Sequence, residues 1–421
     1  MNIGIIGSGG REHALCSKLK QSKIVKKIYC FPGNAGTVNI AHNINIDINN
    51  FEKLKRESEE KKIDLLIVGP EEPLVNGIYD YFKNTNIKVF GPNKIAAQLE
   101  GSKTFTKKIC KKYNIPTSKF EIFKNKSDAL NYLEKSNFPI VIKADGLAAG
   151  KGVYICKNYN QSKLAINEIY EGRFGKAEIV LVEEFLKGEE MSYFIVCDGK
   201  NFKFFQTAQD HKRVGEGDTG PNTGGMGAYS PSRLFSNDLQ NKISNKIIVP
   251  TMQALKDLGT NYKGFLYVGL MIVDNDPYLI EFNVRMGDPE CQTILPLLNS
   301  DLGEIIKACC EENLSEVKVE WLDKKSLCVV LCAKGYPNDY KKNMKINNLE
   351  NIKIKNNQSI FHAGTKFENE NFFSIGGRVL NIVALGDTFD ECKKETDQIL
   401  NKIDWKEGFF RKDIGYKVTN K

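Results

Sequence analysis

The sequence predicts an α/β fold with a doubly wound parallel-sheet domain, an α+β core and a C-terminal β-rich region. In the first hundred residues, short β-rich runs alternate with longer amphipathic segments, which is the pattern of βαβ units. After Pro116, strand-like runs follow one another closely and surround one helical pattern at 161–170. Near Leu327 another β-rich segment begins and continues along the chain.

These patterns place the elements by residue number. The expected strands are 3–6, 27–31, 63–68 and 87–90 in the first domain, and 140–143, 153–156, 179–185, 191–197 and 202–207 in the core. A helix over 238–258 leads into a hairpin that turns at 274–277. We expect an N-terminal substrate-binding domain at 1–102, a central domain at 103–325 with an inserted subdomain at about 120–190, and a C-terminal domain at 326–421.

Composition and charge narrow the partners and the location. The chain has 421 residues, and its 60 Lys and Arg against 52 Asp and Glu give a net charge of +8. The basic residues are spread without a sustained block or interleaved aromatics, so we expect no nucleic-acid partner. The 11 cysteines form no CxxC pair, no signal peptide opens the sequence, and no apolar run is long enough for a bilayer. We therefore expect a cytoplasmic protein without a membrane partner.

A glycine-rich turn follows the first strand at 7–14. Its glycines let backbone amides and a helix N-terminus approach an anion. The pattern departs from a dinucleotide fingerprint, because Glu12 stands at the last glycine position and the second strand ends without an acid for a ribose. A phosphate monoester fits better, and a second loop at 32–36 lies on the same sheet edge. The alternative is a pair of tight βα turns.

A second glycine-rich segment at 143–153 lies between two strands and carries lysines at both ends. Lysines supply point charges and glycines expose amides, so this segment can fold over a triphosphate. No GK[ST] sequence opens a helix, which distinguishes it from a P-loop. The strand at 179–186 then ends in acids that could contact an adenine edge and ribose hydroxyls. The alternatives are a plain hairpin and ordinary surface charges.

The strand at 278–285 places Glu281, Asn283 and Arg285 on one face, opposite the apolar Ile280, Phe282 and Val284. A carboxylate and an amide oxygen are hard ligands for magnesium, and an arginine can take a phosphate or carboxylate oxygen. The alternative is a solvated polar face of a half-buried strand. An acidic turn at 286–293 follows and leads to a helix.

Taken together, these motifs resemble the ATP-grasp superfamily and, within it, the phosphoribosylamine-glycine ligase family. The segments concerned are 7–14, 143–153, 183–185, 209–213, 220–228, 285–290, 362–365 and 411–415. The resemblance covers essentially the whole chain. It implies an ATP-grasp core with a lid subdomain. It also implies ligation of glycine to 5-phosphoribosylamine through glycyl phosphate, with release of ADP and phosphate, in de novo purine biosynthesis.

The resemblance also implies site residues. The catalytic pair would be Arg285 and Lys143. The ATP site would comprise Lys103, Lys143, Gly146, Ala149, Gly150, Lys151, Gly152, Glu183, Glu184, Phe185 and Glu190. Glu281 and Asn283 would hold Mg²⁺ or Mn²⁺. The substrate contacts would come from Gly10, Arg11, Asn34, Asp210, Asn222, Thr223, Gly224, Gly225 and Arg285.

Several alternatives remain at this stage. Rival functions are another purine-pathway ATP-grasp carboxylate-amine ligase, an ATP-binding regulatory module, and a basic nucleic-acid binder. For the histidines at 13, 211 and 362 we expect structural roles, because the ribosylamine nitrogen is already a free amine. Lys366 and Arg378 could reach the ribosyl phosphate, but we interpret them as solvated surface charges and assign them no role. We expect a monomer or a weak dimer.

Overall fold

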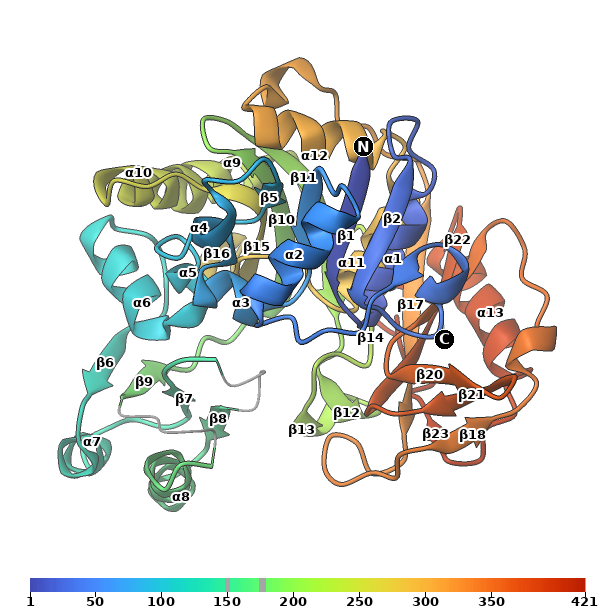
Figure 1. The fold of residues 1–421 in the computed structure, drawn as a ribbon. Helices are drawn as coiled ribbons and strands as arrows, with labels where there is room; N and C mark the ends of the chain where they lie inside the picture. Colours follow the sequence, from blue (N-terminus) through green and yellow to red (C-terminus); the bar gives the residue numbers. More distant parts are fainter. Residues whose placement is uncertain (148–151, 174–178, 421) are drawn as a thin grey trace.

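The computed structural model describes residues 1–147, 152–173 and 179–420, and its first layer is a five-stranded parallel sheet (Figure 1). The strands are β1 (Asn2–Gly7), β2 (Lys27–Pro32), β3 (His42–Asn43), β4 (Leu65–Val68) and β5 (Lys88–Phe90), in the order β3-β2-β1-β4-β5. Its helices are α1 (Gly10–Leu19), α2 (Phe51–Glu60), α3 (Glu71–Asn76) and α4 (Ile78–Phe82). The predicted doubly wound domain is confirmed. The turns after β1, β2 and β4 meet at one edge, where such sheets bind ligands.

A small sheet follows α5 (Gln98–Gly101) and α6 (Lys103–Lys112). It consists of β6 (Phe120–Phe123), β7 (Ile140–Ala144), β8 (Val153–Cys156) and β9 (Val180–Glu184), in the order β6-β9-β7-β8. The helices α7 (Lys126–Leu133) and α8 (Tyr159–Tyr170) pack on it. Only α8 was expected. The α7 segment was missed because it is short and buries just Ala129 and Leu133.

The largest sheet has nine strands and joins the central and C-terminal regions. Eight strands run in the order β16-β15-β10-β11-β14-β17-β22-β19, and β23 pairs with β17. They are β10 (Glu189–Asp198), β11 (Phe202–Asp210), β14 (Gly227–Ser230), β15 (Lys263–Val273), β16 (Asp276–Asn283), β17 (Lys325–Ala333), β19 (Gln358–His362), β22 (Arg378–Gly386) and β23 (Gly408–Phe409). Because β14 pairs with β17 from Gly227 to Ser230, the sheet crosses the expected boundary at 325/326.

The remaining elements surround this sheet. They are α9 (Asn237–Ile243), α10 (Val249–Asp257), α11 (Glu290–Ile294), α12 (Leu302–Glu311) and α13 (Phe389–Leu400), with the strands β12 (Arg213–Gly215), β13 (Thr219–Asn222), β18 (Met344–Ile346), β20 (Thr365–Glu368) and β21 (Asn371–Ser374). A π-helical turn at Ser244–Ile248 interrupts the single helix expected over 238–258. The interruption has a physical cause, because Pro250 lacks the backbone N–H that a continuous α-helix needs.

The hairpin of β15 and β16 contains a β-bulge. Gly269 pairs with Glu281 and the next residue, Leu270, pairs with Leu279, so Ile280 is the extra residue. Phe282 is buried in the same core cluster as Leu279, whereas Ile280 is only half-buried and lies outside that cluster. The prediction that Ile280 shares the apolar face of the strand with Phe282 is therefore wrong. Glu281 still lies on the face opposite Phe282.

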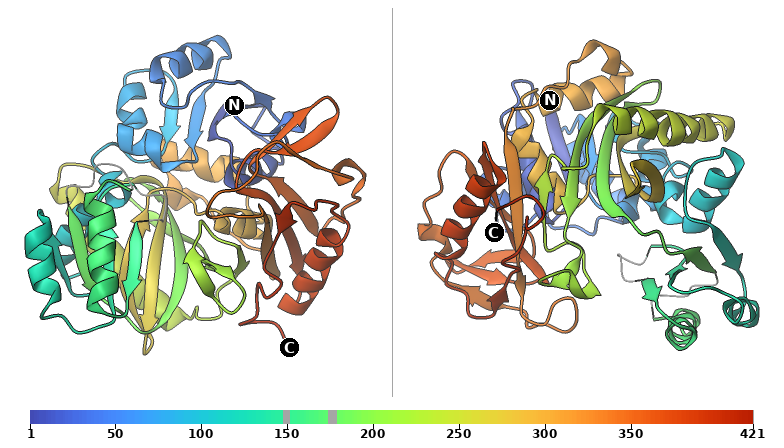
Figure 2. Two further views of the ribbon diagram at one scale, coloured as in Figure 1. Left: turned by 90° about the horizontal axis from the view of Figure 1, so that it is seen from below. Right: turned by 180° about the vertical axis from the view of Figure 1, so that it is seen from behind.

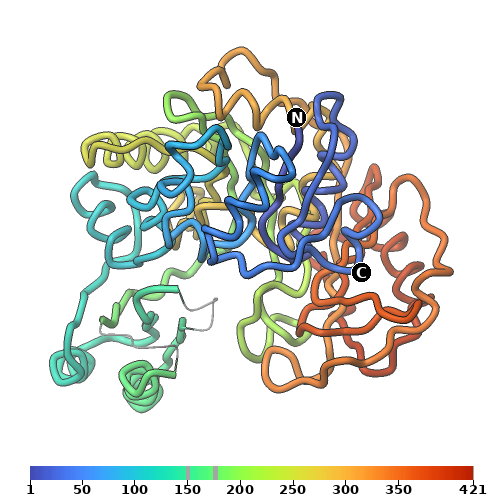
Figure 3. Tube along the Cα trace, in the orientation of Figure 1, coloured from blue at the N-terminus to red at the C-terminus, as the bar shows by residue number. Residues whose placement is uncertain are grey.

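Figures 1 and 2 both show the small sheet and the C-terminal region on opposite sides of the β12–β13 hairpin. The Cα trace in Figure 3 shows the N-terminal domain above both, with the chain start next to α12. One buried cluster includes Ile3, Val196 and Val329, and thus joins the N-terminal, central and C-terminal regions. In the described part of the chain, no helix is long and apolar enough to cross a membrane.

Candidate functional site

Two of the three lysines predicted for the ATP site, Lys103 in α6 and Lys143 in β7, lie where the small sheet meets α6. Ser102 caps α6 and hydrogen-bonds to the Asp145 carboxylate, which also accepts the Thr104 amide at 3.1 Å. This contact fixes the first turn of α6 against the end of β7. Lys103 Nζ donates to the Gly146 carbonyl at 2.8 Å. Burial lowers the pKa of Lys103 below its usual value, although the nearby Glu281 carboxylate opposes this shift.

Lys143 is held by a buried carboxylate. Its Nζ lies 3.1 Å from Glu183 Oε1 and donates to the Ile280 carbonyl at 3.4 Å. Lys107 Nζ lies 2.9 Å from Glu183 Oε2, and Ser118 Oγ donates to the same oxygen. Burial raises the pKa of Glu183, but the two lysines dominate and hold it at about 2. Three elements, α6, β7 and β9, therefore meet in one buried ionic cluster.

An acidic group lies on the adjoining face of the large sheet. Asp210 ends β11, Glu281 projects from β16 beside the bulge, and Lys212 Nζ lies 2.7 Å from Glu190 Oε2. Burial and the carboxylates of Glu290, Glu190 and Glu281 raise the pKa of Asp210 to about 8, although Lys212 lowers it. Glu281 makes no hydrogen bond or ion pair to another described residue. This part of the site therefore attracts cations.

Arg285 follows β16 and is surrounded by carboxylates. Its Nη2 lies 2.7 Å from Glu100 Oε1 and 3.2 Å from Glu71 Oε2, and its Nη1 donates to the Met286 carbonyl at 3.2 Å. Burial raises the pKa of Glu100 to about 7 despite the attraction of Arg285, which in turn lowers the pKa of Glu71. Arg11 Nη1 donates to the same Met286 carbonyl at 3.1 Å. Arg285 thus joins the segment after β16 to the N-terminal domain.

The turn after β1 already holds an anion from the protein itself. Glu12 Oε2 accepts the Gly9 amide at 2.6 Å, and Glu12 Oε1 pairs with Arg11 Nε at 2.6 Å. A Cβ at Gly7 would lie 2.6 Å from Glu12 Cδ, and one at Gly9 would lie 2.8 Å from Glu12 Oε2. The glycines at this turn therefore make room for the Glu12 carboxylate at the N-terminus of α1. The substrate contacts proposed for Gly10 and Arg11 stay predictions.

Three regions meet at Asp288. Its Oδ2 accepts the Arg11 amide at 3.3 Å, and its Oδ1 lies 3.3 Å from Arg378 Nη1. Arg378 also donates to the carbonyls of Asp288 and Gly224, and Gly224 donates its amide to the Tyr336 hydroxyl at 2.9 Å. The interpretation of Arg378 as a solvated surface charge is wrong, because this guanidinium links the glycine-rich loop to the turn after Arg285.

Asn34 and the three inner histidines form hydrogen bonds within the protein. Asn34 Nδ2 donates to the carbonyls of Ser8 at 2.9 Å and His362 at 2.8 Å. His13 Nδ1 accepts the His362 amide at 2.9 Å, and His211 Nε2 accepts the Gly415 amide at 2.8 Å. Burial lowers the pKa of His13 to about 3 and those of His211 and His362 to about 4 each. These neutral rings support the structural roles expected for them.

Some predicted residues lie apart from the clusters. Glu184 and Phe185 are exposed beyond the end of the buried part of β9, and Glu184 Oε1 accepts the Lys119 amide at 2.9 Å.

Thr223 Oγ1 donates to the Lys212 carbonyl at 2.9 Å, which ties the glycine-rich loop to the acidic group. Gly146 has a left-handed φ of 90° and nothing within 4 Å of a Cβ placed there. Gly152 accepts the Ala144 amide at 2.9 Å. Asn222 and Gly225 flank the loop that Arg378 contacts. Ala149, Gly150 and Lys151 lie outside the described residues.

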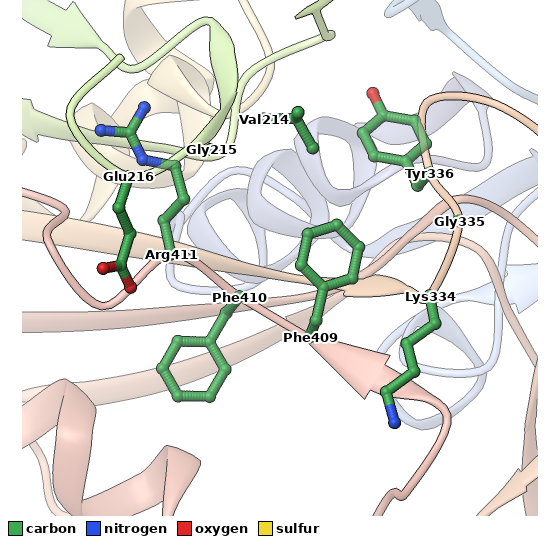
Figure 4. Close-up of a pocket in the computed structure, with 9 residues that line it drawn as sticks. All are labelled: Val214, Gly215, Glu216, Lys334, Gly335, Tyr336, Phe409, Phe410 and Arg411. Atoms are coloured by element: carbon green, nitrogen blue, oxygen red, sulfur yellow. The ribbon is translucent and has the colours of Figure 1, made fainter. Parts of the chain in front are cut away.

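A separate pocket of about 440 Å³ lies between the β12–β13 hairpin and the C-terminal segment (Figure 4). Phe409 points toward Tyr336 across it, and Arg411 lies at its far side. No predicted site residue is among the residues that line it. The Tyr336 hydroxyl connects this pocket to the site, because it accepts the Gly224 amide.

Comparisons with known proteins identify the fold. Family models for phosphoribosylglycinamide synthetase match the chain in three parts, the N domain at residues 1–100, the ATP-grasp (A) domain at 101–291 and the C domain at 326–417. A phosphoribosylamine--glycine ligase from Caldanaerobacter subterraneus is 47% identical over 98% of this chain and 99% of its own length. Another phosphoribosylamine--glycine ligase, from Brucella melitensis, is 45% identical over 100% of this chain and 99% of its own length.

Solved structures agree with these matches. The crystal structure of phosphoribosylamine--glycine ligase from Thermotoga maritima has a TM-score of 0.84 and 33% identity, covering 98% of this chain and 100% of that one. A biotin carboxylase from Campylobacter jejuni has a TM-score of 0.72 over 96% of this chain and 91% of that chain, at 15% identity, and so shares the fold alone.

The ATP-grasp domain match and the relatives named phosphoribosylamine--glycine ligase show that the chain is an ATP-dependent carboxylate-amine ligase of the ATP-grasp class. Such enzymes use ATP with a divalent metal ion. Over nearly its whole length, the chain matches the N, ATP-grasp and C domains of one family within that class. It belongs to the phosphoribosylglycinamide synthetase family.

Sequence reasoning missed four residues that the structure brings into the site. Lys107 could have been found, because it lies four residues after Lys103 on the same face of α6. Lys212 stands within the motif at 209–213, where only Asp210 was selected. Glu100 and Arg378 reach their partners through long-range contacts, which no local pattern indicates.

Proposed function

We propose that this chain joins glycine to 5-phosphoribosylamine at the expense of ATP, giving glycinamide ribonucleotide, ADP and phosphate in purine biosynthesis. The single observation that supports the site assignment is the convergence of Lys103, Lys143, Glu281 and Arg285 from three different segments, namely α6, β7 and the end of β16 with the residues after it. Two ammonium groups, a carboxylate without a partner among the described residues and a guanidinium are the groups that phosphoryl transfer to a carboxylate requires.

The reaction needs ATP because a carboxylate is a poor electrophile. A glycine carboxylate oxygen attacks the γ-phosphorus, the bond to the β–γ bridging oxygen breaks, and ADP leaves. The amine nitrogen of phosphoribosylamine then attacks the carbonyl carbon of glycyl phosphate. Phosphate leaves with the former carboxylate oxygen, and the nitrogen loses a proton. Because the attacking group is a neutral amine, the enzyme needs position and charge more than a strong base.

Each charged residue has a part in this scheme. Lys103 and Lys143 neutralise the ATP phosphates. Arg285 stabilises the transferring phosphoryl group or the glycine carboxylate. Asp210 lies among carboxylates, and this negative surrounding favours binding of the ammonium group of glycine next to it. The acids at the end of β9 and the start of β10 border the adenosine, with Glu190 at the ribose.

Glu281 and Asn283 fit a divalent cation. The Glu281 carboxylate is half-buried and has no hydrogen-bond or ion-pair partner among the described residues. Within the described ranges, Asn283 Oδ1 accepts only a 3.4 Å hydrogen bond from Arg285, so it retains acceptor capacity. Among the described residues no group of three or more His, Cys, Asp and Glu side chains has metal-site geometry. Two protein oxygens suit Mg²⁺ or Mn²⁺, which take further ligands from water and phosphates and would neutralise the charge of the triphosphate.

The substrate side is assigned to the junction of the three regions. Gly10, Arg11 and the residues at 222–225 surround Asp288 and Arg378, and this junction lies beside Arg285 through the shared Met286 carbonyl. Phosphoribosylamine bound there would present its amine to an acyl phosphate at Arg285.

We further propose the domain division 1–102, 103–325 and 326–421 and a monomeric or weakly dimeric state. We also propose a cytoplasmic location, which the 11 unpaired cysteines favour.

The test is product formation by the purified protein. ADP release is measured with ATP, Mg²⁺ and glycine, with and without phosphoribosylamine generated in situ, while mass spectrometry follows glycinamide ribonucleotide. Product that depends on all three substrates is expected. ATP turnover with formate or bicarbonate, but without this product, would instead favour another purine-pathway ATP-grasp ligase.

A further inference from the structure

Glu100 holds the two residues that directly follow β16. It lies in α5, between the N-terminal domain and α6, and its side chain is only 8% exposed. Its Oε2 accepts the Val284 amide at 2.7 Å, and its Oε1 lies 2.7 Å from Arg285 Nη2. Both oxygens are therefore used on the backbone and the guanidinium of one short segment. A carboxylate that makes two such contacts fixes the direction of the partner guanidinium and also compensates its charge.

Arg285 has other partners, but they hold it less firmly. Glu71, from the start of α3, approaches Nη2 at 3.2 Å with a side chain that is 26% exposed. Asn283 Oδ1 lies 3.4 Å from the same nitrogen. A long arginine side chain loses much rotamer freedom when it is fixed in one direction, so its orientation requires a firm anchor. Glu100 is the partner that combines deep burial, the shorter distance and a second contact to the backbone.

We propose that Glu100 is a positioning residue that aims the Arg285 guanidinium at the reacting groups. This inference rests on the proposed function, in which Arg285 contacts the transferring phosphoryl group or the glycine carboxylate. Glu100 itself does not touch substrate in this scheme. It acts from behind Arg285, and the Val284 contact keeps the segment after β16 in register with α5.

A double-mutant cycle tests this role. Glu100→Gln removes the charge and turns one of its two acceptors into a donor. It should lower kcat for product formation about 10- to 100-fold, the effect of losing one charge-assisted hydrogen bond, with little change in KM for ATP. In an Arg285→Ala background the same change should cost less than about 3-fold, because the group on which Glu100 acts is absent.

Controls separate this role from a general loss of structure. Glu72→Gln, at the exposed neighbour of Glu71 in α3, should stay within about 2-fold of the parent. If Glu100→Gln does not fold, Glu100→Asp keeps the charge, and its kcat should fall less than that of Glu100→Ala. Thermal unfolding with and without ADP checks that each variant binds nucleotide.

The possible outcomes are distinct. Equal fold losses for Glu100→Gln with and without Arg285 would overturn the positioning role. A kcat unchanged by Glu100→Gln would also overturn it. If Arg285→Ala alone keeps parental kcat, the role of Arg285 in the proposed function fails, and the inference fails with it. If Arg285→Ala lowers kcat and Glu100→Gln does not, only the inference fails.

Discussion

Replacement of Glu183 by glutamine should loosen the small sheet from α6. Glu183 is 4% exposed and pairs with Lys107 and Lys143, whose side chains are 3% and 7% exposed. Its pKa falls from 4.5 to about 2, which corresponds to about 3 kcal/mol in favour of the charged form. Glu183→Gln leaves two buried ammonium groups without their counter-charge, and such losses cost about 3–5 kcal/mol. We expect a local destabilisation of about 3 kcal/mol.

Hydrogen exchange followed by mass spectrometry measures this effect, because a protein of several regions need not unfold in one step. Peptides from β7 and β9 should lose protection in Glu183→Gln, whereas peptides from β1 should keep it. The matched control is Glu184→Gln, at the exposed next residue of the same strand, which should change little. Equal loss of protection in both variants, or no loss in either, would refute the reasoning.

The pH dependence of this effect has a definite sign. The pKa of Glu183 is lower in the folded protein, so its contribution is fully present above the unfolded pKa of 4.5. It is lost as the pH falls from 4.5 towards 2. The difference between the parent protein and Glu183→Gln should therefore shrink over this range, because the protonated parent also lacks the charge.

Three further predictions concern the metal, the C-terminal segment and acid stability. Glu281→Gln should lower kcat more than about 10-fold and raise the Mg²⁺ concentration that gives half-maximal ADP release. An unchanged Mg²⁺ titration would contradict the metal assignment. Arg411→Met should lower the free energy of unfolding by about 2 kcal/mol in urea titrations, because two partly exposed aspartates at 218 and 413 lose a guanidinium whose side chain is 1% exposed. The exposed Lys412→Met serves as its control and should change this free energy by less than about 0.5 kcal/mol. As the pH falls from 6.5 towards 4, the urea midpoint should decrease, because three buried histidines stabilise the fold only while they are neutral. Replacing any one of them by a neutral side chain should reduce this decrease, whereas His42→Asn, on the surface, should leave it unchanged. The three are His13, His211 and His362.

Local patterns predicted the parts of the site that depend on neighbouring residues. Alternation along one strand placed Glu281, Asn283 and Arg285 on a common face, and glycines after strands marked the turns at the sheet edge. The structure keeps that face even though Ile280 forms a bulge. A bulge adds one residue without changing composition, so alternation alone does not reveal it.

Contacts between distant segments could not be predicted in this way. Glu100 and Arg285 are 185 residues apart, and Arg378 is 154 residues from Gly224. Each of these charges resembles a surface residue in its own segment. Glu12 was noted only as an exception to a glycine pattern, yet its carboxylate fills the turn that the pattern assigned to a ligand. Tertiary packing decides such roles, because burial gives each charge its partner.

The pairing of β14 with β17 limits how independently the central and C-terminal regions can change. Their register runs from Gly227 opposite Val329 to Ser230 opposite Ser326. A fragment that stops before β17 would leave β14 as an open edge, which invites pairing with other chains. A chimera that takes its C-terminal region from a relative would have to preserve this register. Although the C domain is matched as a separate unit at residues 326–417, its sheet is continuous with that of the central region.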